Sequence, residues 1–259
     1  SGFFYRGPVL DPAFMIGARE TLQTDANGDF LPDPAPASLV NQIIADGLSP
    51  DDYLMPDAGS ASGYVLRNPI YTEFPGGYRP KFGADITDYA VVLGIRGEND
   101  NGFSWDIRGR IAENEVEYVL SQSINPSLGR LTPTTFNPGT LTQEESSVNA
   151  DFVKSFDNSP LNIGFGFEWR NETYVIDTGD PASIAVGPTA AQFGVGSDGF
   201  QGYAPESAGE FESDSYAAYI DIETDITDKF SAAFALRFED YEESDSTLDW
   251  KISGRYDFT

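Results

Sequence analysis

The segment from Leu161 to Arg170, LNIGFGFEWR, constrains the possible folds of this chain more than any other. One parity carries Leu, Ile, Phe, Phe and Trp, whereas the other carries Asn, Gly, Gly, Glu and Arg. A period of two residues is typical of a β-strand, whose successive side chains point to opposite faces. The two faces of this strand therefore lie in different surroundings. A protein core and a lipid bilayer both suit one such strand, so the rest of the sequence must decide between them.

The same alternation occurs in six further segments, so the sequence predicts seven strands that each have one apolar and one polar face. The segments lie near residues 89–96, 105–111, 148–156, 216–223, 230–239 and 250–258. Full charges fall in mid-strand on the parity that is not apolar. They are Arg96, Arg108, Arg110, Glu168, Arg170, Asp221, Glu223, Arg237, Lys251 and Arg255. A water-filled interior of a barrel and the solvated face of a soluble sheet both allow such charges.

The lengths of the connections separate these two possibilities. Short turns are expected near residues 100, 158 and 228, and longer polar connections near 130, 195 and, to a lesser degree, 243. Transmembrane barrels of the outer membrane alternate short periplasmic turns with long extracellular loops in this way, and a soluble sandwich has no reason to do so. The sequence therefore predicts an all-β, antiparallel transmembrane β-barrel segment over residues 81–259, with long extracellular loops.

Composition excludes several classes of function. Fifteen basic residues stand against forty-two acidic ones, and a formal charge of −27 would repel the phosphates of nucleic acid. The chain has no Cys and no His, which excludes disulfides, thiolate or imidazole metal sites and histidine-based catalytic triads. It also lacks an apolar run of about twenty residues, the length that a transmembrane helix needs.

Residues 1–80 lack sustained periodicity and are expected to form an extracellular loop region or small lobe. A short helix is predicted between Pro36 and Leu48, where apolar residues recur at helical spacing and Gly47 and Pro50 are stop signals. A helix packed under its own loop explains this pattern better than a partner-binding helix does.

The stretch from Asp25 to Asp33, DANGDFLPD, is a candidate calcium loop. Oxygen-bearing side chains around a glycine turn are what Ca²⁺ requires, because this ion takes six to eight oxygen ligands. The candidate ligands are Asp25, Asn27, Asp29, Leu31 and Asp33. The stretch resembles calcium loops of thrombospondin type 3 repeats, but it has Phe30 where glycine is usual. It also has Pro36 where an EF-hand places its bidentate Glu. The alternative is an acidic turn without metal.

Several runs of residues resemble the β-barrel of TonB-dependent outer-membrane receptors over about residues 80–259. The matching runs are LNIGFGFEWRNETY (161–174), GFQGY (199–203), SDSYAAYIDI (213–222), RFEDY (237–241) and SGRYDF (253–258). The resemblance implies a 22-stranded barrel, of which this chain supplies about seven or eight strands. It also implies an N-terminal plug and uptake of siderophores or other scarce nutrients powered by TonB. No plug or TonB box is recognisable in this sequence, so the chain is expected to be the middle of a receptor.

The resemblance also implies partners and residue roles. The expected partners are outer-membrane lipid, lipopolysaccharide, a nutrient ligand and, through a plug that this sequence lacks, TonB. Residues 119–140 and 177–212 are expected to admit the ligand. Seven charged residues are expected to face the lumen, where the arginines contact the plug or an anionic substrate, or form ion pairs within the wall. They are Arg96, Arg108, Arg110, Glu168, Arg170, Arg237 and Arg255.

Two other classes of function are weaker alternatives. A soluble secreted β-domain or adhesin with a calcium-stabilised lobe fits the strands but not the alternation of loop lengths. A glycosidase has only adjacent carboxylates in its favour, so no enzymatic activity is expected. The glycine run from Gly194 to Gly199 matches a dinucleotide fingerprint in spacing alone, because it lacks the preceding strand and following helix. No cofactor is expected to be required, and calcium would be structural.

Overall fold

The computed structural model describes residues 20–24, 30–75, 77–157 and 159–258. These residues divide into two compact units, a loop unit and a sheet unit. The loop unit comprises the described residues up to Asp85 together with Val116–Leu141 and Ile176–Gly209. The sheet unit comprises Ile86–Glu115, Thr142–Val175 and the residues from Glu210 onward.

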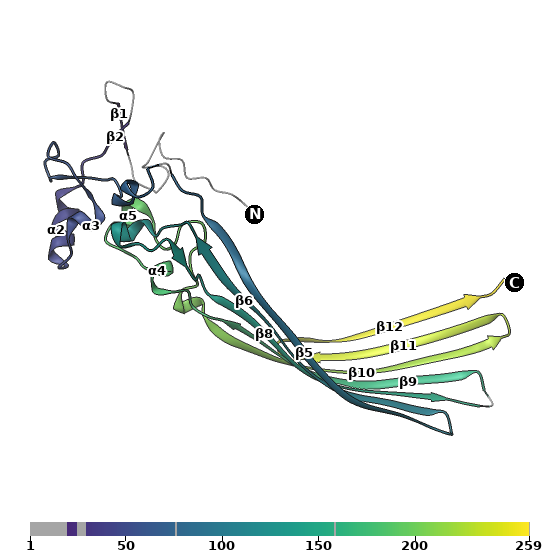
Figure 1. The fold of residues 1–259 in the computed structure, drawn as a ribbon. Helices are drawn as coiled ribbons and strands as arrows, with labels where there is room; N and C mark the ends of the chain where they lie inside the picture. The colour runs from purple at the N-terminus through teal and green to yellow at the C-terminus, as the bar shows by residue number, and fades with distance from the viewer. Residues whose placement is uncertain (1–19, 25–29, 76, 158, 259) are drawn as a thin grey trace. The chain divides into compact units, whose positions relative to one another are not determined.

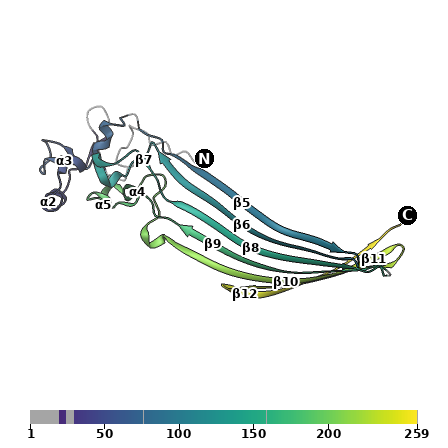
Figure 2. The same ribbon diagram turned by 60° about the horizontal axis from the view of Figure 1, so that its bottom comes forward.

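One large sheet contains the seven long strands that the alternation predicts. They are β5 (Lys81–Asn99), β6 (Phe103–Ser121), β8 (Thr140–Ser155), β9 (Leu161–Ile176), β10 (Gly209–Thr227), β11 (Phe230–Tyr241) and β12 (Ser244–Tyr256). The strand order is β12-β11-β10-β9-β8-β6-β5, and the short strand β7 (Thr135–Phe136) pairs with β6. Each long strand therefore lies beside its neighbours in sequence, as Figures 1 and 2 show.

Several strands are longer than their apolar alternation. On β6, the parity that carries Trp105 and Ile107 continues with Glu113, Glu115 and Glu117, and the strand still extends to Ser121. The opposite parity becomes apolar there, with Val116, Tyr118 and Leu120, so the apolar residues change face while pairing with neighbouring strands maintains the extended backbone. The two long connections shorten accordingly to residues 122–139 and 177–208, within the predicted ranges 119–140 and 177–212.

The connection between β11 and β12 differs from its prediction. Tyr241 pairs with Ser244, which leaves only Glu242 and Glu243 in the turn. The expectation of a longer loop near residue 243 is therefore wrong. Acidic composition from Asp240 to Asp245 suggested the loop, but polar side chains on both faces do not prevent strand pairing in water.

The loop unit has small cores of its own. The predicted helix is confirmed as α2 (Ala37–Ala45), which buries Leu39, Val40 and Ile43 beside α3 (Pro50–Tyr53) and Leu54. A second core gathers Ile70, Tyr78, Ile124 and Phe193. The remaining elements are short: β1 (Glu20–Thr24), β2 (Phe30–Pro32), β3 (Met55–Pro56), β4 (Tyr64–Val65), η1 (Pro69–Thr72), η2 (Pro126–Leu131), α4 (Pro181–Ile184), α5 (Ala190–Phe193) and η3 (Pro205–Ser207).

Candidate functional site

The sheet unit has one apolar face and one charged face. A side chain at Gly94 would meet Arg108, so Arg96, two residues further along β5, shares the face of Arg108. On β11 and β12, Arg237 pairs with Asp249 and Ser231 with Arg255, which places both arginines on a common parity. We call this face the charged face. The opposite, apolar face is largely uncovered, with Leu93 76% and Trp250 67% exposed.

Ion pairs cross the charged face from strand to strand. Arg108 on β6 lies 2.8 Å from Asp151 on β8 and 3.2 Å from Asp106 on its own strand. Arg110 pairs with Glu145 on β8. Because these arginine side chains are about 40% exposed, each pair contributes about 0–1 kcal/mol. The pairs therefore define the register of neighbouring strands more than they stabilise the sheet.

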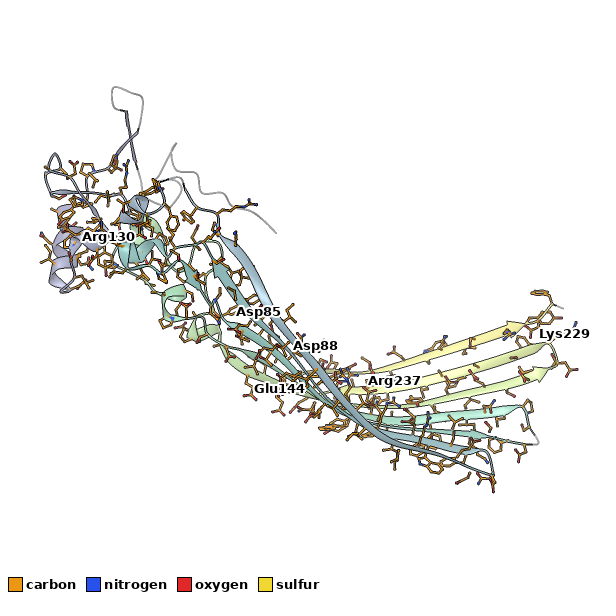
Figure 3. The ribbon with its side chains drawn as sticks, in the orientation of Figure 1. Asp85, Asp88, Arg130, Glu144, Lys229 and Arg237 are labelled. Carbon is orange, nitrogen blue, oxygen red and sulfur yellow. The ribbon has the colours of Figure 1, made fainter. Side chains whose placement is uncertain are left out.

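Glu168 on β9 is the centre of a second group. It lies 2.6 Å from Arg170 and 3.5 Å from Arg237, and Arg237 in turn lies 2.6 Å from Glu239. Figure 3 shows Arg237 partway along β11, with Lys229 at the turn that begins this strand. Glu168, Arg170 and Arg237 thus stand together from strands that are separate in sequence.

The remaining arginines of the predicted set lie apart from these groups. Arg255 pairs at 3.1 Å with Asp257, two residues away. Arg96 is exposed and has no ion-pair partner in the part of the chain that the structure describes. Among the described residues, five of the six arginines thus form ion pairs and Arg96 does not, and the roles of the set stay a prediction.

Tyr219 explains Gly166 of β9, which the sequence pattern leaves without a role. Its hydroxyl donates a 2.7 Å hydrogen bond to Asp151 on β8, two strands away. To reach Asp151 the ring lies across Gly166, where an added Cβ would come within 2.5 Å of it. At Gly164, by contrast, an added Cβ would make only an ordinary contact, 3.8 Å from Asp221. Gly166 therefore leaves the space for a tyrosine that connects three strands.

Two depressions lie on the charged face along β11. On the charged face, this part of β11 carries only the small side chains of Ser231, Ala233 and Ala235. One depression of about 370 Å³ is lined by residues 219–221, 235–237 and 249–251. The other, about 350 Å³, is bordered by Asn162, Glu223, Asp225, Ser231, Ala233, Ser253 and Arg255. The charged face is thus hollowed where its side chains are small, a shape suited to contact with another protein surface.

The apolar face ends at a polar border. The Trp169 indole donates a 3.1 Å hydrogen bond to Asp214 on β10, and the Asn171 amide, two residues on, donates to Glu212 and Asp214. On β5, the hydroxyl of Tyr89 donates at 2.8 Å to Glu113 of β6. Aromatic rings with a polar partner on one side only are typical of a boundary between an apolar medium and water.

Aromatic rings also gather toward the opposite end of the apolar face. Phe152 stacks with Phe103 at 6.0 Å and with Phe165 at 5.2 Å, and Phe103 lies 6.4 Å from Trp105. Phe103 follows directly on the short turn between β5 and β6. The apolar face is thus bordered by aromatic residues at both ends.

In the loop unit, buried polar side chains fasten the two long connections to each other. Asn125 is fully buried, and its amide donates to the carbonyl oxygens of Ala182 and Ala185 at 2.8 and 3.0 Å. Its carbonyl oxygen accepts from the backbone and hydroxyl of Ser127, whose hydroxyl accepts from the Gly187 amide. We call this set, with the contacts of Asn68 and Tyr78 described next, the polar clamp.

The polar clamp also includes the segment before β5. Asn68 is fully buried and donates to the Pro126 carbonyl at 2.5 Å. Tyr78 donates a 3.0 Å hydrogen bond to Asp198, whose backbone amide donates to the Ile124 carbonyl. Neither long connection is therefore independent of the other. Sequence reasoning missed this clamp, because Ser, Asn and Thr in a polar loop do not reveal which of them are buried.

The candidate calcium ligands fall largely outside the described residues. Asp25, Asn27 and Asp29 lie in the undescribed stretch, whereas Leu31 belongs to β2 and Asp33 is half-buried. Elsewhere in the described ranges, no three acidic side chains are grouped to hold a metal ion. The calcium site therefore stays a prediction. No helix among the described residues has the length and apolar character needed to cross a membrane.

Comparison with known proteins supplies the family. Residues 35–259 match the family described as TonB dependent receptor-like, beta-barrel. No curated protein matches the chain. The match spans every long strand of the sheet, together with α2 and both long connections. The chain therefore belongs to the β-barrel family of TonB-dependent receptors, which are transport proteins of the Gram-negative outer membrane.

Proposed function

We propose that this chain forms part of the wall of a transporter that takes up a siderophore or another scarce nutrient. In this proposal the apolar face contacts outer-membrane lipid and the charged face lines the lumen. The carboxylates of the polar border share divalent cations with the phosphates of lipopolysaccharide. The two unlike faces of every long strand carry the proposal, since a largely uncovered apolar face in water would drive aggregation. The family assignment favours this interpretation over a soluble secreted domain and over a glycosidase.

The charged face has two tasks in such a transporter. Its paired arginines hold neighbouring strands in register, and Arg96 stays available to a plug or to an anionic nutrient. A folded plug can pack into the depressions along β11. No step in this proposal alters the nutrient chemically, so the protein acts as a transporter without enzymatic activity.

Uptake measured with a panel of labelled nutrients tests the proposal. A strain that lacks the receptor is compared with the same strain carrying the full-length protein, each with and without TonB. The panel contains ferric siderophores, a cobalamin and oligosaccharides. We expect one nutrient to accumulate only when receptor and TonB are both present. Uptake that persists unchanged without TonB would contradict the proposal.

The availability of Arg96 is tested in the same assay. Arg96→Gln is expected to weaken uptake of an anionic nutrient about tenfold, because a charge-assisted contact is lost. Arg255→Gln, which removes an exposed arginine paired only with its neighbour, is the matched control and is expected to leave uptake unchanged. Equal effects of the two variants would show that Arg96 has no special role.

A further inference from the structure

Strand β10 continues past the end of its neighbour β11. The last residues to pair across the two strands are Ser215 and Tyr241, after which the chain turns at Glu242 and Glu243 into β12. On β10, residues 210–214 extend beyond this point, which at about 3.4 Å per residue amounts to about 17 Å of strand. Figure 1 shows β11 and β12 ending while β10 continues.

The backbone of this extension is open on one side only. Asn171 of β9 contacts Glu212 and Asp214 on the covered side of the strand pair. On the other side, Asp214 accepts a 3.0 Å hydrogen bond from the Glu242 amide, and its own amide donates to the Glu242 carboxylate at 3.3 Å. Glu242 therefore completes the ladder at Asp214, and it is the last residue of the β11–β12 hairpin that reaches β10.

Alternate residues of a strand direct their backbone N–H and C=O groups to the same side. Glu212 and Glu210 therefore direct theirs to the side of Asp214, past the end of β11. Among the described residues no strand lies there to receive them. An exposed row of unpaired backbone groups is a template for a further strand.

The side chains of the extension define what kind of strand would fit. Glu210 and Glu212 are exposed on one face, and Phe211 is 57% exposed on the other. Glu242 and Glu243 add two more exposed carboxylates at the end of the open edge. Opposite charges directly across a strand pair are favourable and like charges are unfavourable. With forty-two acidic against fifteen basic residues, a second copy of this chain is a poor occupant.

We propose that the open edge of β10 at residues 210–213 binds an extended, basic segment of a partner protein by strand addition. Lys or Arg at alternate positions of that segment pairs with Glu210 and Glu212, and an apolar residue between them packs against Phe211. Backbone hydrogen bonds to Glu210 and Glu212 supply the affinity, and the carboxylates select the partner. This partner contact is separate from nutrient uptake and does not depend on which nutrient is carried.

A synthetic heptapeptide that alternates Lys and Val is the probe, added to the full-length protein in detergent at low salt. We expect saturable binding that weakens with salt, with an infrared band of isotope-labelled peptide carbonyls typical of paired strands. The same peptide with N-methylated amides on its pairing side keeps its charge but lacks the donors, and is expected to bind about tenfold more weakly. Equal binding of the two peptides would overturn strand addition.

Two variants locate the site. Glu212→Pro removes the open-edge N–H while sparing the groups that face β9, and is expected to reduce peptide binding about tenfold. Paired substitution of Glu210→Gln and Glu212→Gln keeps the backbone and is expected to reduce both affinity and salt dependence. Unchanged binding to both variants would overturn the site, as would self-association of the protein through this edge. Because the N-methylated peptide is tested on the unaltered protein, a folding defect in a variant leaves the test decisive.

Discussion

At the scale of single residues, glycines opposite aromatic rings are a recurrent device of this sheet. Gly166 lies under Tyr219, Gly97 lies against Trp105, and the Phe230 ring covers Gly254. An aromatic ring over a glycine restores the packing that the missing side chain would have provided. Gly166 in LNIGFGFEWR is thus part of the packing of the charged face.

Gly166→Val tests this arrangement. The added side chain occupies the space of the Tyr219 ring and breaks the hydrogen bond to Asp151, so we expect a loss of about 1–3 kcal/mol in the free energy of unfolding. Gly83→Val on β5, where no atom lies within 4 Å of the added Cβ, is the control and should change it by less than about 0.5 kcal/mol. Urea unfolding of the full-length protein in detergent, followed by tryptophan fluorescence, measures both. Equal losses would contradict the packing role of Gly166.

Tyr64 in the loop unit gives a prediction about pH. Its hydroxyl donates a 2.8 Å hydrogen bond to Asp51, and this bond, followed by burial and the charge of Asp51, raises the pKa of Tyr64 above its ordinary value of 10.0. The bond therefore stabilises the fold fully below pH 10.0 and is lost as the pH rises through the raised pKa. The melting temperature of the wild type should therefore fall as the pH rises above 10.0, and Tyr64→Phe should remove this part of the fall. An identical fall in melting temperature at alkaline pH in wild type and variant would contradict this role of the hydrogen bond.

The calcium prediction is also tested at single residues. If Asp25, Asn27, Asp29, Leu31 and Asp33 hold Ca²⁺, adding the ion should raise the melting temperature and a chelator should lower it. Asp29→Ala should abolish both effects. A melting temperature that changes neither with chelator nor with the substitution would count against the site.

At the scale of elements, the sequence predicts what depends on local alternation and misses what depends on pairing. Leu161–Arg170 lies within β9 with Glu168 and Arg170 on the charged face, as its period predicts. The extension of β6 through Glu113 and Glu117 was missed, because the apolar residues change parity there, from Ile107 and Ile111 to Val116, Tyr118 and Leu120. The cross-strand partners of Arg108 and Arg237 could not be predicted either, since only the register decides which carboxylates lie opposite.

The helix α2 was predictable from its spacing, and its buried face can be tested. Ile43 is fully buried, whereas its neighbour Ile44 is 56% exposed. Ile43→Ala leaves a cavity and should cost about 2–5 kcal/mol of local stability. Ile44→Ala should cost less than about 0.5 kcal/mol. Hydrogen exchange over residues 37–54, read by mass spectrometry, should show faster exchange in the first variant alone, and similar exchange in both would contradict the packing of α2.

At the scale of the whole molecule, the two faces of the sheet predict opposite responses to an added charge. Ile220→Arg puts a cation on the apolar face and should cost about 2–4 kcal/mol if that face meets lipid. Ser253→Arg puts the same charge on the charged face and should cost much less. The fraction of full-length protein that folds into lipid vesicles, read from gel mobility, measures the difference. Equal folding of the two variants would contradict a lipid-facing apolar surface.

The polar clamp has a consequence for the order of events during folding. The hydrogen bond between Tyr78 and Asp198 joins residues 120 positions apart, and strands β5, β6, β8 and β9 lie between them in the chain. Closing so long a loop in an unfolded chain is entropically unfavourable, and the pairing of those four strands shortens the path beforehand. The clamp is therefore expected to form late in time, although its first residues stand early in the sequence. Formation of the polar clamp is therefore expected to follow pairing of the four strands that lie between Tyr78 and Asp198.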